Sequence, residues 1–282
     1  MKKLFLLLAL LGMVTVGCSK DDTDKDNDNN NKIYYTTSDN TKLFPKTDAS
    51  LYGAILISNT YKDGQGVLVF DDAVTTIGNS AFEDCSSLTS ITIPYSVNTI
   101  GEDAFYRCNS LTSVTIPDSV TTIGERAFQE CYSLISVTIP DSVTAIGDYA
   151  FRDCSSLTSV TIPNSVNTIG NYAFYWCESL TSVTIPNSVN TIGNSAFKHC
   201  DNLISVTIPG SVTTIGEGAF QYCCSLTSVY CKRATPPAGG GFYMFSYNAS
   251  DRKIYVPMGS VGAYKSAEGW SVYASDIVGY NF

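Results

Sequence analysis

Ten cysteines are the residues of this chain best suited to covalent or metal chemistry. Seven of them recur every 23 residues, each three residues after a Phe and three residues before a Leu. They are Cys85, Cys108, Cys131, Cys154, Cys177, Cys200 and Cys223. A fixed place among apolar residues predicts a buried column in which each thiol acts as a small apolar side chain. Because the side chains of such a column point in parallel, they do not meet disulfide geometry, and we expect free thiols.

Three cysteines stand outside this column, of which Cys18 lies near the N-terminus and the other two belong to the end of the repeats. Cys231 replaces an Ile of the repeated strand pattern and is predicted to be buried, whereas Cys224 lies at a polar position and is predicted to be exposed. A disulfide between the two remains an open alternative. The sequence contains no Cys-x-x-Cys pair and no group of histidines, so neither a metal ion nor another cofactor is expected.

The sequence contains few residues that are suited to catalysis. His199 is the only histidine, and its position in the repeat is taken elsewhere by Arg, Glu, Asp, Trp and Tyr. We therefore expect a surface histidine without a Ser-His-Asp arrangement around it. Carboxylates are scattered among the turns and are not paired by the repeat. These observations favour a protein that binds partners and is not an enzyme.

Two surfaces remain that could bind a partner. The first comprises positions flanking the repeated Ala-Phe, where the residue type changes from copy to copy and aromatic residues gather. This candidate binding patch consists of Tyr106, Arg107, Tyr149, Tyr172, Tyr175, Trp176 and His199. Tyr, Trp and Arg contribute most of the binding energy at many protein interfaces. The alternative is that these positions are unconstrained by packing and vary by drift.

The second surface is formed by Ser and Thr that alternate with apolar residues in every copy. This candidate sheet-face platform consists of Ser113, Thr115, Ser136, Thr138, Ser159, Thr161, Ser182 and Thr184. Regular rows of hydroxyl groups would suit an extended polymer, a peptide or a glycan. The alternative is that hydroxyl and β-branched residues simply suit an exposed strand.

A 23-residue repeat must position all of these side chains. In each copy, Leu-x-x-Val-x-Ile-Pro predicts a short strand that points Val and Ile inward, Ser and Thr outward, and that ends at Pro. A turn follows, Val and Ile re-enter the core, and Gly permits a bend before Ala-Phe-x-x-Cys, where a helical or 3₁₀ turn is expected. Repeats of this length predict a solenoid in which neighbouring coils bury each other's apolar faces.

Over residues 74–231, the Leu-x-x-Val-x-Ile strand and the Ile-Gly-x-x-Ala-Phe-x-x-Cys segment resemble the BspA-type leucine-rich repeats of bacterial surface proteins. The resemblance implies an α/β leucine-rich repeat solenoid of seven coils, with a parallel β-sheet on one face and short helical turns opposite. Residues 33–73 are expected to form an N-terminal β cap, and residues 232–282 a C-terminal cap. The family also implies adhesion to host matrix or to other bacteria.

The N-terminal residues predict export. Residues 1–17 combine two lysines with an apolar stretch and are expected to be a lipoprotein signal peptide, and the small residues before Cys18 resemble a lipobox, which implies lipidation of that cysteine. Residues 18–32 are polar and acidic and predict a disordered tether whose start resembles the export signal of Bacteroidetes surface lipoproteins. We therefore expect a lipid-anchored protein on the outer membrane, exposed at the cell surface.

Charge and location together limit the partners. A net charge of −9 without a basic run excludes nucleic acid, and the membrane is contacted only through the N-terminal lipid. The favoured function is an adhesin-like lipoprotein that binds host extracellular or bacterial surface proteins. A lipoprotein that captures glycans is the first alternative, and a structural spacer is the second. The Asp-Ser-Val sequences at 118–120 and 141–143 also resemble a Bacteroidetes O-glycosylation motif, and this modification is left open.

Overall fold

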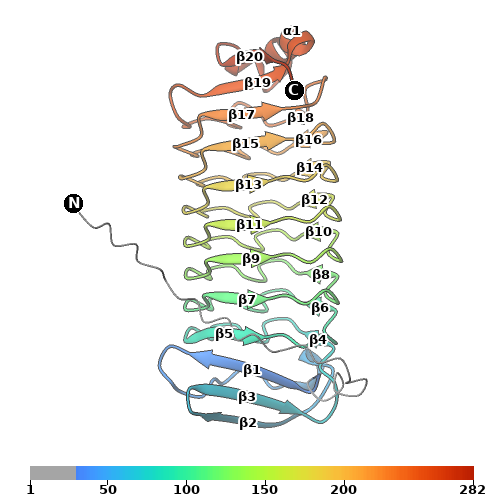
Figure 1. The fold of residues 1–282 in the computed structure, drawn as a ribbon, viewed down its shortest axis with the longest axis vertical. Helices are drawn as coiled ribbons and strands as arrows, with labels where there is room; N and C mark the ends of the chain where they lie inside the picture. The colour runs from blue at the N-terminus through green and yellow to red at the C-terminus, as the bar shows by residue number, and fades with distance from the viewer. Residues whose placement is uncertain (1–29) are drawn as a thin grey trace, which may run out of the picture.

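The computed structural model describes residues 30–282 and has the form of a parallel-strand solenoid of about nine turns (Figure 1). The expected solenoid and its spacing of about 23 residues are confirmed. The predictions for the signal peptide and for lipidation of Cys18 concern residues outside the described range. Strands β1 and β20 lie towards opposite ends of the stack, so the chain advances along one axis.

One face of the solenoid is a long sheet of twelve strands, to which each coil contributes one strand. Neighbouring coils pair in parallel with equivalent residues side by side, as in Ser159 with Ser182 and Thr161 with Thr184. The strands in its coil region are β5 (Leu88–Thr92), β7 (Ser113–Thr115), β9 (Ser136–Thr138), β11 (Ser159–Thr161), β13 (Ser182–Thr184), β15 (Ser205–Ile208), β17 (Ser228–Cys231), β19 (Lys253–Pro257) and β20 (Ile277–Tyr280).

A second sheet of eight strands runs along another side of the stack. Its strands are two residues long and parallel, and their second residue, Ile in most coils, points into the core. They are β4 (Thr76–Ile77), β6 (Thr99–Ile100), β8 (Thr122–Ile123), β10 (Ala145–Ile146), β12 (Thr168–Ile169), β14 (Thr191–Ile192), β16 (Thr214–Ile215) and β18 (Ala238–Gly239). The sequence did not predict this sheet, because a two-residue strand has no detectable period.

Three antiparallel strands close the N-terminal end of the stack. Strand β1 (Lys32–Thr37) pairs antiparallel with β5 on one side and with β3 (Gln65–Phe70) on the other. Strand β2 (Leu56–Lys62) then forms the outer edge, and a short 3₁₀ helix, η1 (Ala49–Leu51), lies in the connection between β1 and β2. The buried ring of Tyr52 covers the first coil, with its centroid 6.1 Å from that of Phe82.

At the other end the structure contains an eighth coil that the sequence did not predict. Its Phe245 ring stacks on Phe220 at 5.6 Å, and the Phe220 N–H donates to the Met244 carbonyl at 2.9 Å, as earlier coils do to each other. After this coil come η2 (Met258–Ser260), α1 (Val261–Ser266) and η3 (Ser271–Tyr273). The indole of Trp270 is fully buried against Phe245, which ends the apolar core.

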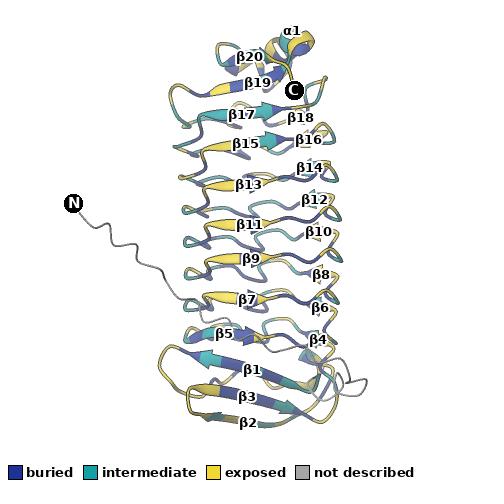
Figure 2. Cartoon of the chain, in the orientation of Figure 1, coloured by how far each residue is buried: buried dark blue, intermediate teal, exposed yellow. Residues whose placement is uncertain are grey.

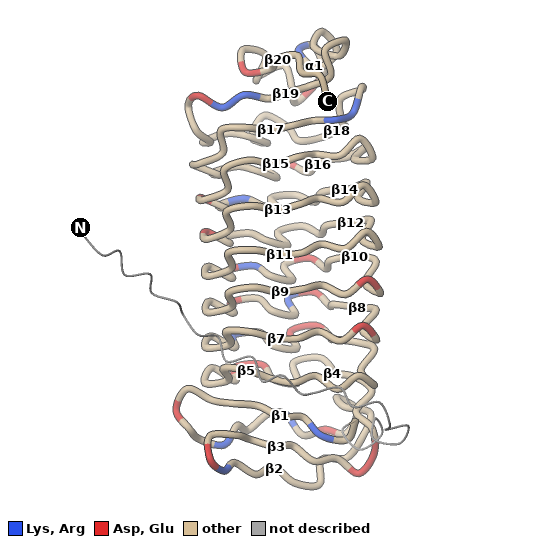
Figure 3. Tube along the Cα trace, in the orientation of Figure 1, with Lys and Arg blue, Asp and Glu red and all other residues tan. Residues whose placement is uncertain are grey.

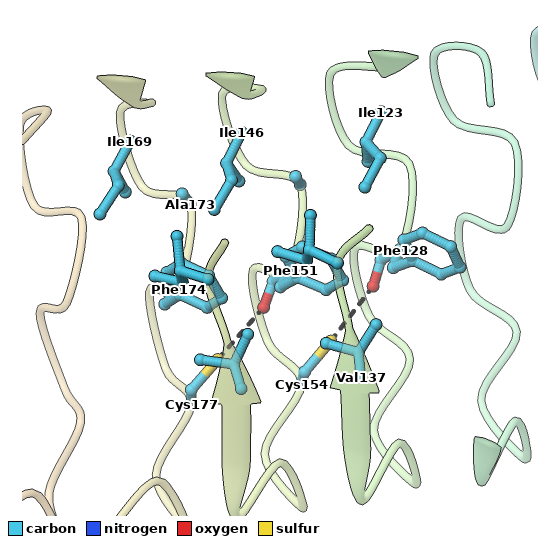
Figure 4. Close-up of a cluster of buried hydrophobic side chains, with 14 of the residues drawn as sticks. Ile123, Phe128, Val137, Ile146, Phe151, Cys154, Ile169, Ala173, Phe174 and Cys177 are labelled. Carbon is cyan, nitrogen blue, oxygen red and sulfur yellow. Dashed lines mark hydrogen bonds between the residues drawn. The ribbon is translucent and has the colours of Figure 1, made fainter. Parts of the chain in front are cut away.

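The core is built from identical columns of side chains (Figure 4). Phenylalanine rings from Phe82 to Phe245 stack with centroids 5.1 to 5.6 Å apart. The Cys154 thiol donates to the Phe128 carbonyl of the preceding coil at 3.3 Å, and the other repeat cysteines from Cys108 onward do the same. The nine described cysteines are free thiols, and Cys224 is the exposed one, as predicted.

The third side of each coil, residues 101–108 and their equivalents, is hereafter called the turn wall. A helical or 3₁₀ turn was expected there, but the turn wall is a run of tight turns with no regular helix. The repeated Gly that begins it also has a different role from the bend that was expected. A Cβ atom on Gly147 would lie 2.9 Å from the Gly124 oxygen, so the absent side chain lets neighbouring coils approach.

Candidate binding surfaces

The predicted patch lies on the turn wall, where two residues in each coil have a positive φ. The first column of such residues has φ between 51° and 63° and consists of Ser80, Asp103, Arg126, Tyr149, Tyr172, Ser195 and Gly218. The second column has φ between 58° and 61° and consists of Asp84, Arg107, Glu130, Asp153, Trp176, His199, Tyr222 and Tyr247. Both columns coincide with positions whose residue type changes between repeats.

This left-handed backbone joins one coil to the next. The Tyr172 N–H donates to the Asn194 carbonyl at 2.8 Å, and the Trp176 N–H donates to the Lys198 carbonyl at 2.9 Å. The Phe174 N–H between them also donates to the next coil, to the Ala196 carbonyl at 2.8 Å, whereas the Tyr175 N–H donates within its own coil to the Tyr172 carbonyl at 3.1 Å. Every second N–H of this segment is therefore directed along the solenoid axis, and the left-handed residues Tyr172 and Trp176 supply two of these three donors, whichever side chains they carry.

Five of the seven predicted patch residues come together and are extended by two more aromatic residues. Their rings form a continuous series with neighbouring centroids 4.4 to 5.9 Å apart. We call this series the aromatic ladder; it consists of Tyr149, Tyr172, Tyr175, Trp176, His199, Tyr222 and Tyr247. Trp176 and Tyr247 are the most exposed members, at 43% and 62%.

Tyr222 and Tyr247 were not among the predicted residues. Tyr222 occupies the same repeat position as Trp176 and His199, so its column alone could have identified it. Tyr247 belongs to the eighth coil, in which a Gly-rich segment changes the spacing and hides the repeat. It stacks on Tyr222 at 4.4 Å and carries the aromatic ladder to the end of the turn wall.

Two cations lie against rings of the aromatic ladder. The Arg152 guanidinium carbon is 5.8 Å from the Tyr149 centroid and 5.4 Å from the Tyr175 centroid. The Lys198 ammonium is 5.5 Å from the Tyr222 centroid. All three distances are within the range of cation–π attraction, which restrains these side chains and rings.

The remaining two predicted patch residues form a separate group. The Arg107 guanidinium lies 4.7 Å from the Tyr106 centroid, and its Nε pairs with the Glu130 carboxylate at 3.1 Å. The Tyr106 hydroxyl donates to the same carboxylate at 3.1 Å. These contacts occupy Tyr106 and Arg107 with an ion pair in the second and third coils, away from the aromatic ladder.

His199 lies on the outer side of the turn wall, where neighbouring rings cover part of its side chain and leave 26% of it exposed. Its ring stacks on Tyr222 at 4.5 Å, and its Nδ1 is 3.6 Å from the Asp201 carboxylate. Burial lowers the pKa of His199 below its ordinary value, and the attraction of Asp201 opposes this shift only in part. The imidazole is therefore held as a neutral aromatic member of the ladder.

Charged residues are unevenly distributed along the chain trace of the stack (Figure 3). The second column is charged in the first four coils and aromatic in the last four. Between residues 154 and 231 the charged residues are Glu178, Lys198, Asp201 and Glu217. The C-terminal half of the turn wall is thus the aromatic half, and long-range charge contributes little to recognition there.

The Ser and Thr platform lies on the long sheet, a different side of the coil (Figure 2). Ser136 pairs with Ser159 and Thr138 with Thr161, so the residues form two straight rows. All eight predicted platform residues are exposed. The row of threonines ends at Tyr230, whose ring stacks on Tyr255 at 4.8 Å.

Comparison with known proteins identifies the family to which these repeats belong. Residues 65–157 and 121–250 match the family described as BspA type leucine rich repeat region, with six copies. The chain belongs to the BspA-type leucine-rich repeat family. BspA-type leucine-rich repeat proteins are commonly surface or binding proteins, and their repeats are a non-catalytic kind of scaffold.

Solved structures of leucine-rich repeat proteins resemble the chain in fold, and two of them also in sequence. A leucine-rich repeat protein from Bacteroides ovatus is 30% identical with a TM-score of 0.58, and the match covers 77% of this chain and 59% of that protein. A leucine-rich repeat protein from T. pallidum is 34% identical with a TM-score of 0.52, and the match covers 55% of this chain and 73% of that protein. The pneumococcal vaccine antigen PcpA shares the fold at 20% identity, with a TM-score of 0.55, over 75% of this chain and 60% of that protein. No curated protein sequence matches.

Two further features concern residues 30–282. None of the helices in this range is both long enough and apolar enough to span a membrane. The same residues contain no group of three or more His, Cys, Asp or Glu side chains placed to hold a metal ion.

Proposed function

We propose that this BspA-type leucine-rich repeat protein is an adhesin-like surface lipoprotein that binds host extracellular or bacterial surface proteins and catalyses no reaction. The aromatic ladder is the proposed binding surface. The observation that carries the proposal is the presence of bulky aromatic residues at left-handed backbone positions, where Gly, Asn or Asp is tolerated more easily.

At these positions the left-handed backbone costs free energy, and stacking of the side-chain ring returns some of it. A non-Gly residue in the left-handed region costs about 1–2 kcal/mol. The inter-coil hydrogen bond needs only the backbone, so Gly would provide it at lower cost. Ring stacking returns about 0.5–1.5 kcal/mol per pair. Stacking therefore offsets the cost at best, and selection for a binding role accounts for the choice of Trp176, His199 and Tyr222.

The rigidity of the aromatic ladder also suits binding. Its rings are already fixed by stacking and by cations, so a partner would immobilise few additional side chains. Large aromatic groups with little rotamer freedom give contact area at a low entropic cost. The exposed faces of Trp176 and Tyr247 would supply most of that area.

The proposed location rests on the N-terminal sequence. A lipid on Cys18, followed by the polar residues up to 32, would hold the solenoid outside the outer membrane. The first described coil would then lie nearest the membrane. The aromatic half of the turn wall belongs to the later coils and would face partners outside the cell.

The decisive experiment replaces Tyr175 and Trp176 together with Ala. Binding to immobilised host matrix proteins, measured by surface plasmon resonance, should weaken by about tenfold or more, as expected for central aromatic contacts. The melting temperature should fall by a few degrees at most, because the lost ring contacts lie on the surface of the turn wall and the core is unchanged.

Tyr95 provides the matched control, because it is an aromatic residue that is 77% exposed at a turn away from the aromatic ladder. Tyr95→Ala should bind the same matrix proteins as strongly as the natural chain. The proposal fails if the double variant binds at full strength, or if the Tyr95 variant loses as much affinity.

A further inference from the structure

The first column of the turn wall is interrupted beside the aromatic ladder. Tyr172 is followed by Ser195 and Gly218, and the equivalent repeat position of the eighth coil is Tyr243, immediately before Met244, the equivalent of Ala219; Tyr243 itself does not have a positive φ. Two successive coils without a large side chain leave a cleft of about 390 Å³. We call it the tyrosine cleft, and its volume falls within the range of small-molecule sites.

An aromatic ring stands at each end of the tyrosine cleft. Tyr172 stacks on Tyr149 at 4.9 Å, so its opposite face is turned towards the coil that carries Ser195. Tyr243 is 52% exposed at the other end. Three coil steps separate the two tyrosines, which is about 14 Å at the ~4.8 Å spacing of strands.

Four polar side chains line the tyrosine cleft between these rings, namely Asn194, Lys198, Glu217 and Gln221. No ion pair joins Lys198 or Glu217 to another residue in the described part of the chain. The Asn194 Oδ1 accepts the Glu217 N–H at 2.8 Å, which leaves the Asn194 Nδ2 group to donate to a ligand. The lining thus offers both donors and acceptors and carries no net charge.

We propose that the tyrosine cleft binds a neutral sugar residue of a glycan. A pyranose ring has C–H groups that pack on aromatic faces and hydroxyl groups around its edge that need both donors and acceptors. Tyr172 and Tyr243 supply aromatic faces at the two ends of the cleft, and because they lie about 14 Å apart, each would pack on a different residue of the glycan. The amides, the ammonium and the carboxylate bind the hydroxyls, each of which can donate and accept.

The lining disfavours other ligand classes. An anion in the tyrosine cleft would lie against the Glu217 carboxylate, and a cation would lie against the Lys198 ammonium. A large apolar group would bury four polar side chains without partners, at a substantial cost in free energy. A neutral, hydroxyl-rich ring is the ligand that satisfies all of them.

The inference goes beyond the proposed adhesion to proteins and does not depend on it. The tyrosine cleft shares Tyr172 with the aromatic ladder, but its polar residues contribute no ring to the ladder. A variant that blocks the cleft can therefore be separated from one that removes Tyr175 and Trp176.

The test is an array of neutral oligosaccharides (glucans, mannans, galactans and N-acetylglucosamine oligomers) probed with the full chain in detergent. We expect at least one of them to bind, and Ser195→Tyr to weaken that binding by about tenfold or more, because the new ring fills the site. The substitution suits the backbone, since Ser195 has φ 51° and the same column carries Tyr149 at 59° and Tyr172 at 56°.

Ser80→Tyr is the matched control, because Ser80 has φ 58° in the same column of the first coil, far from the tyrosine cleft. It should bind sugars like the natural chain, as should the Tyr175 and Trp176 double variant. If Ser195→Tyr does not fold, Gln221→Ala provides the same comparison. The proposal is overturned if no neutral glycan binds, if only acidic glycans or peptides bind, or if the blocked variants bind as well as the natural chain.

Discussion

The left-handed residues of the turn wall link the stability of this protein to its surface chemistry. Most of them keep an unfavourable backbone conformation while their N–H donates to a carbonyl of the next coil. The side chain is free of that task and can vary. The same position therefore carries Asp84 near one end of the stack and Tyr247 near the other, without a change in the fold.

Comparing Gly and Ala at Trp176 separates the two roles of this residue. Trp176→Gly should be more stable than Trp176→Ala by about 1 kcal/mol, because Gly has no steric conflict at φ 58°. Both variants should lose partner binding equally. Urea unfolding followed by circular dichroism measures the difference, and equal stability of the two variants would show that the backbone strain is absent.

His199 makes stability depend on pH at the centre of the aromatic ladder. Its pKa in the folded state is lowered, chiefly by burial, so the folded protein resists protonation and the unfolded chain does not. Its contribution to stability is full above the ordinary histidine pKa of about 6.5 and is lost as the pH falls below that value. The melting temperature should therefore fall more steeply between pH 7 and pH 5 in the natural chain than in His199→Gln, and parallel curves would contradict this.

Neighbouring coils lie in close contact at the corner where each turn wall begins. The Gly that begins each turn wall leaves no room for a Cβ, which at Gly147 would meet the Gly124 backbone at 2.9 to 3.0 Å. The contact is between backbones, so neither side can move without disturbing the inter-coil hydrogen bonds. The fold therefore requires glycine at this corner because of proximity between coils.

Gly147→Ala should destabilise the protein by about 1–3 kcal/mol, the usual cost of overpacking a tight site. Gly210→Ala provides the control, because a Cβ there would have its nearest neighbour at 3.8 Å, which is ordinary contact. Guanidinium unfolding of the two variants should give clearly different midpoints. Similar midpoints would mean that the corner can relax.

The sequence predicted those parts of the coil that repeat at a fixed period. The strand of Leu-x-x-Val-x-Ile, the outward rows of Ser and Thr, and the buried cysteine column all follow from spacing and residue type. The left-handed positions did not, because Tyr172 and Trp176 are residue types that rarely adopt that conformation. The second sheet and the eighth coil were missed because two-residue strands and an irregular Gly-rich segment give no periodic signal.

The sequence predicted only the part of the candidate site that is formed by residues of neighbouring repeats. Tyr149, Tyr172, Tyr175 and Trp176 occupy equivalent or adjacent positions of successive copies, so their proximity followed from the repeat itself. The tyrosine cleft depends on Tyr243, whose alignment with Gly218 appears only once the eighth coil is recognised. Its existence therefore required the three-dimensional register.

The whole molecule is a one-dimensional stack whose coils contact only their neighbours, so its stability should be close to a sum over coils. Deleting residues 141–163 removes one 23-residue repeat and joins equivalent turns. The shortened protein should fold cooperatively with a lower melting temperature, measured by scanning calorimetry. Deleting only residues 141–152 breaks the register and should prevent folding; if both deletions behave alike, the stack is not additive.

The hydrogen bonds of the turn wall also determine how this molecule responds to mechanical load. These hydrogen bonds join neighbouring coils and run along the solenoid axis. The N-terminal end of the chain and the aromatic ladder of the later coils lie at different heights along that axis. Tension applied between these two places would act on the coils in series and open them one at a time. Each released coil would lengthen from about 5 Å to about 80 Å of extended chain. A protein held at both places would therefore yield gradually and absorb work, as an extensible tether does.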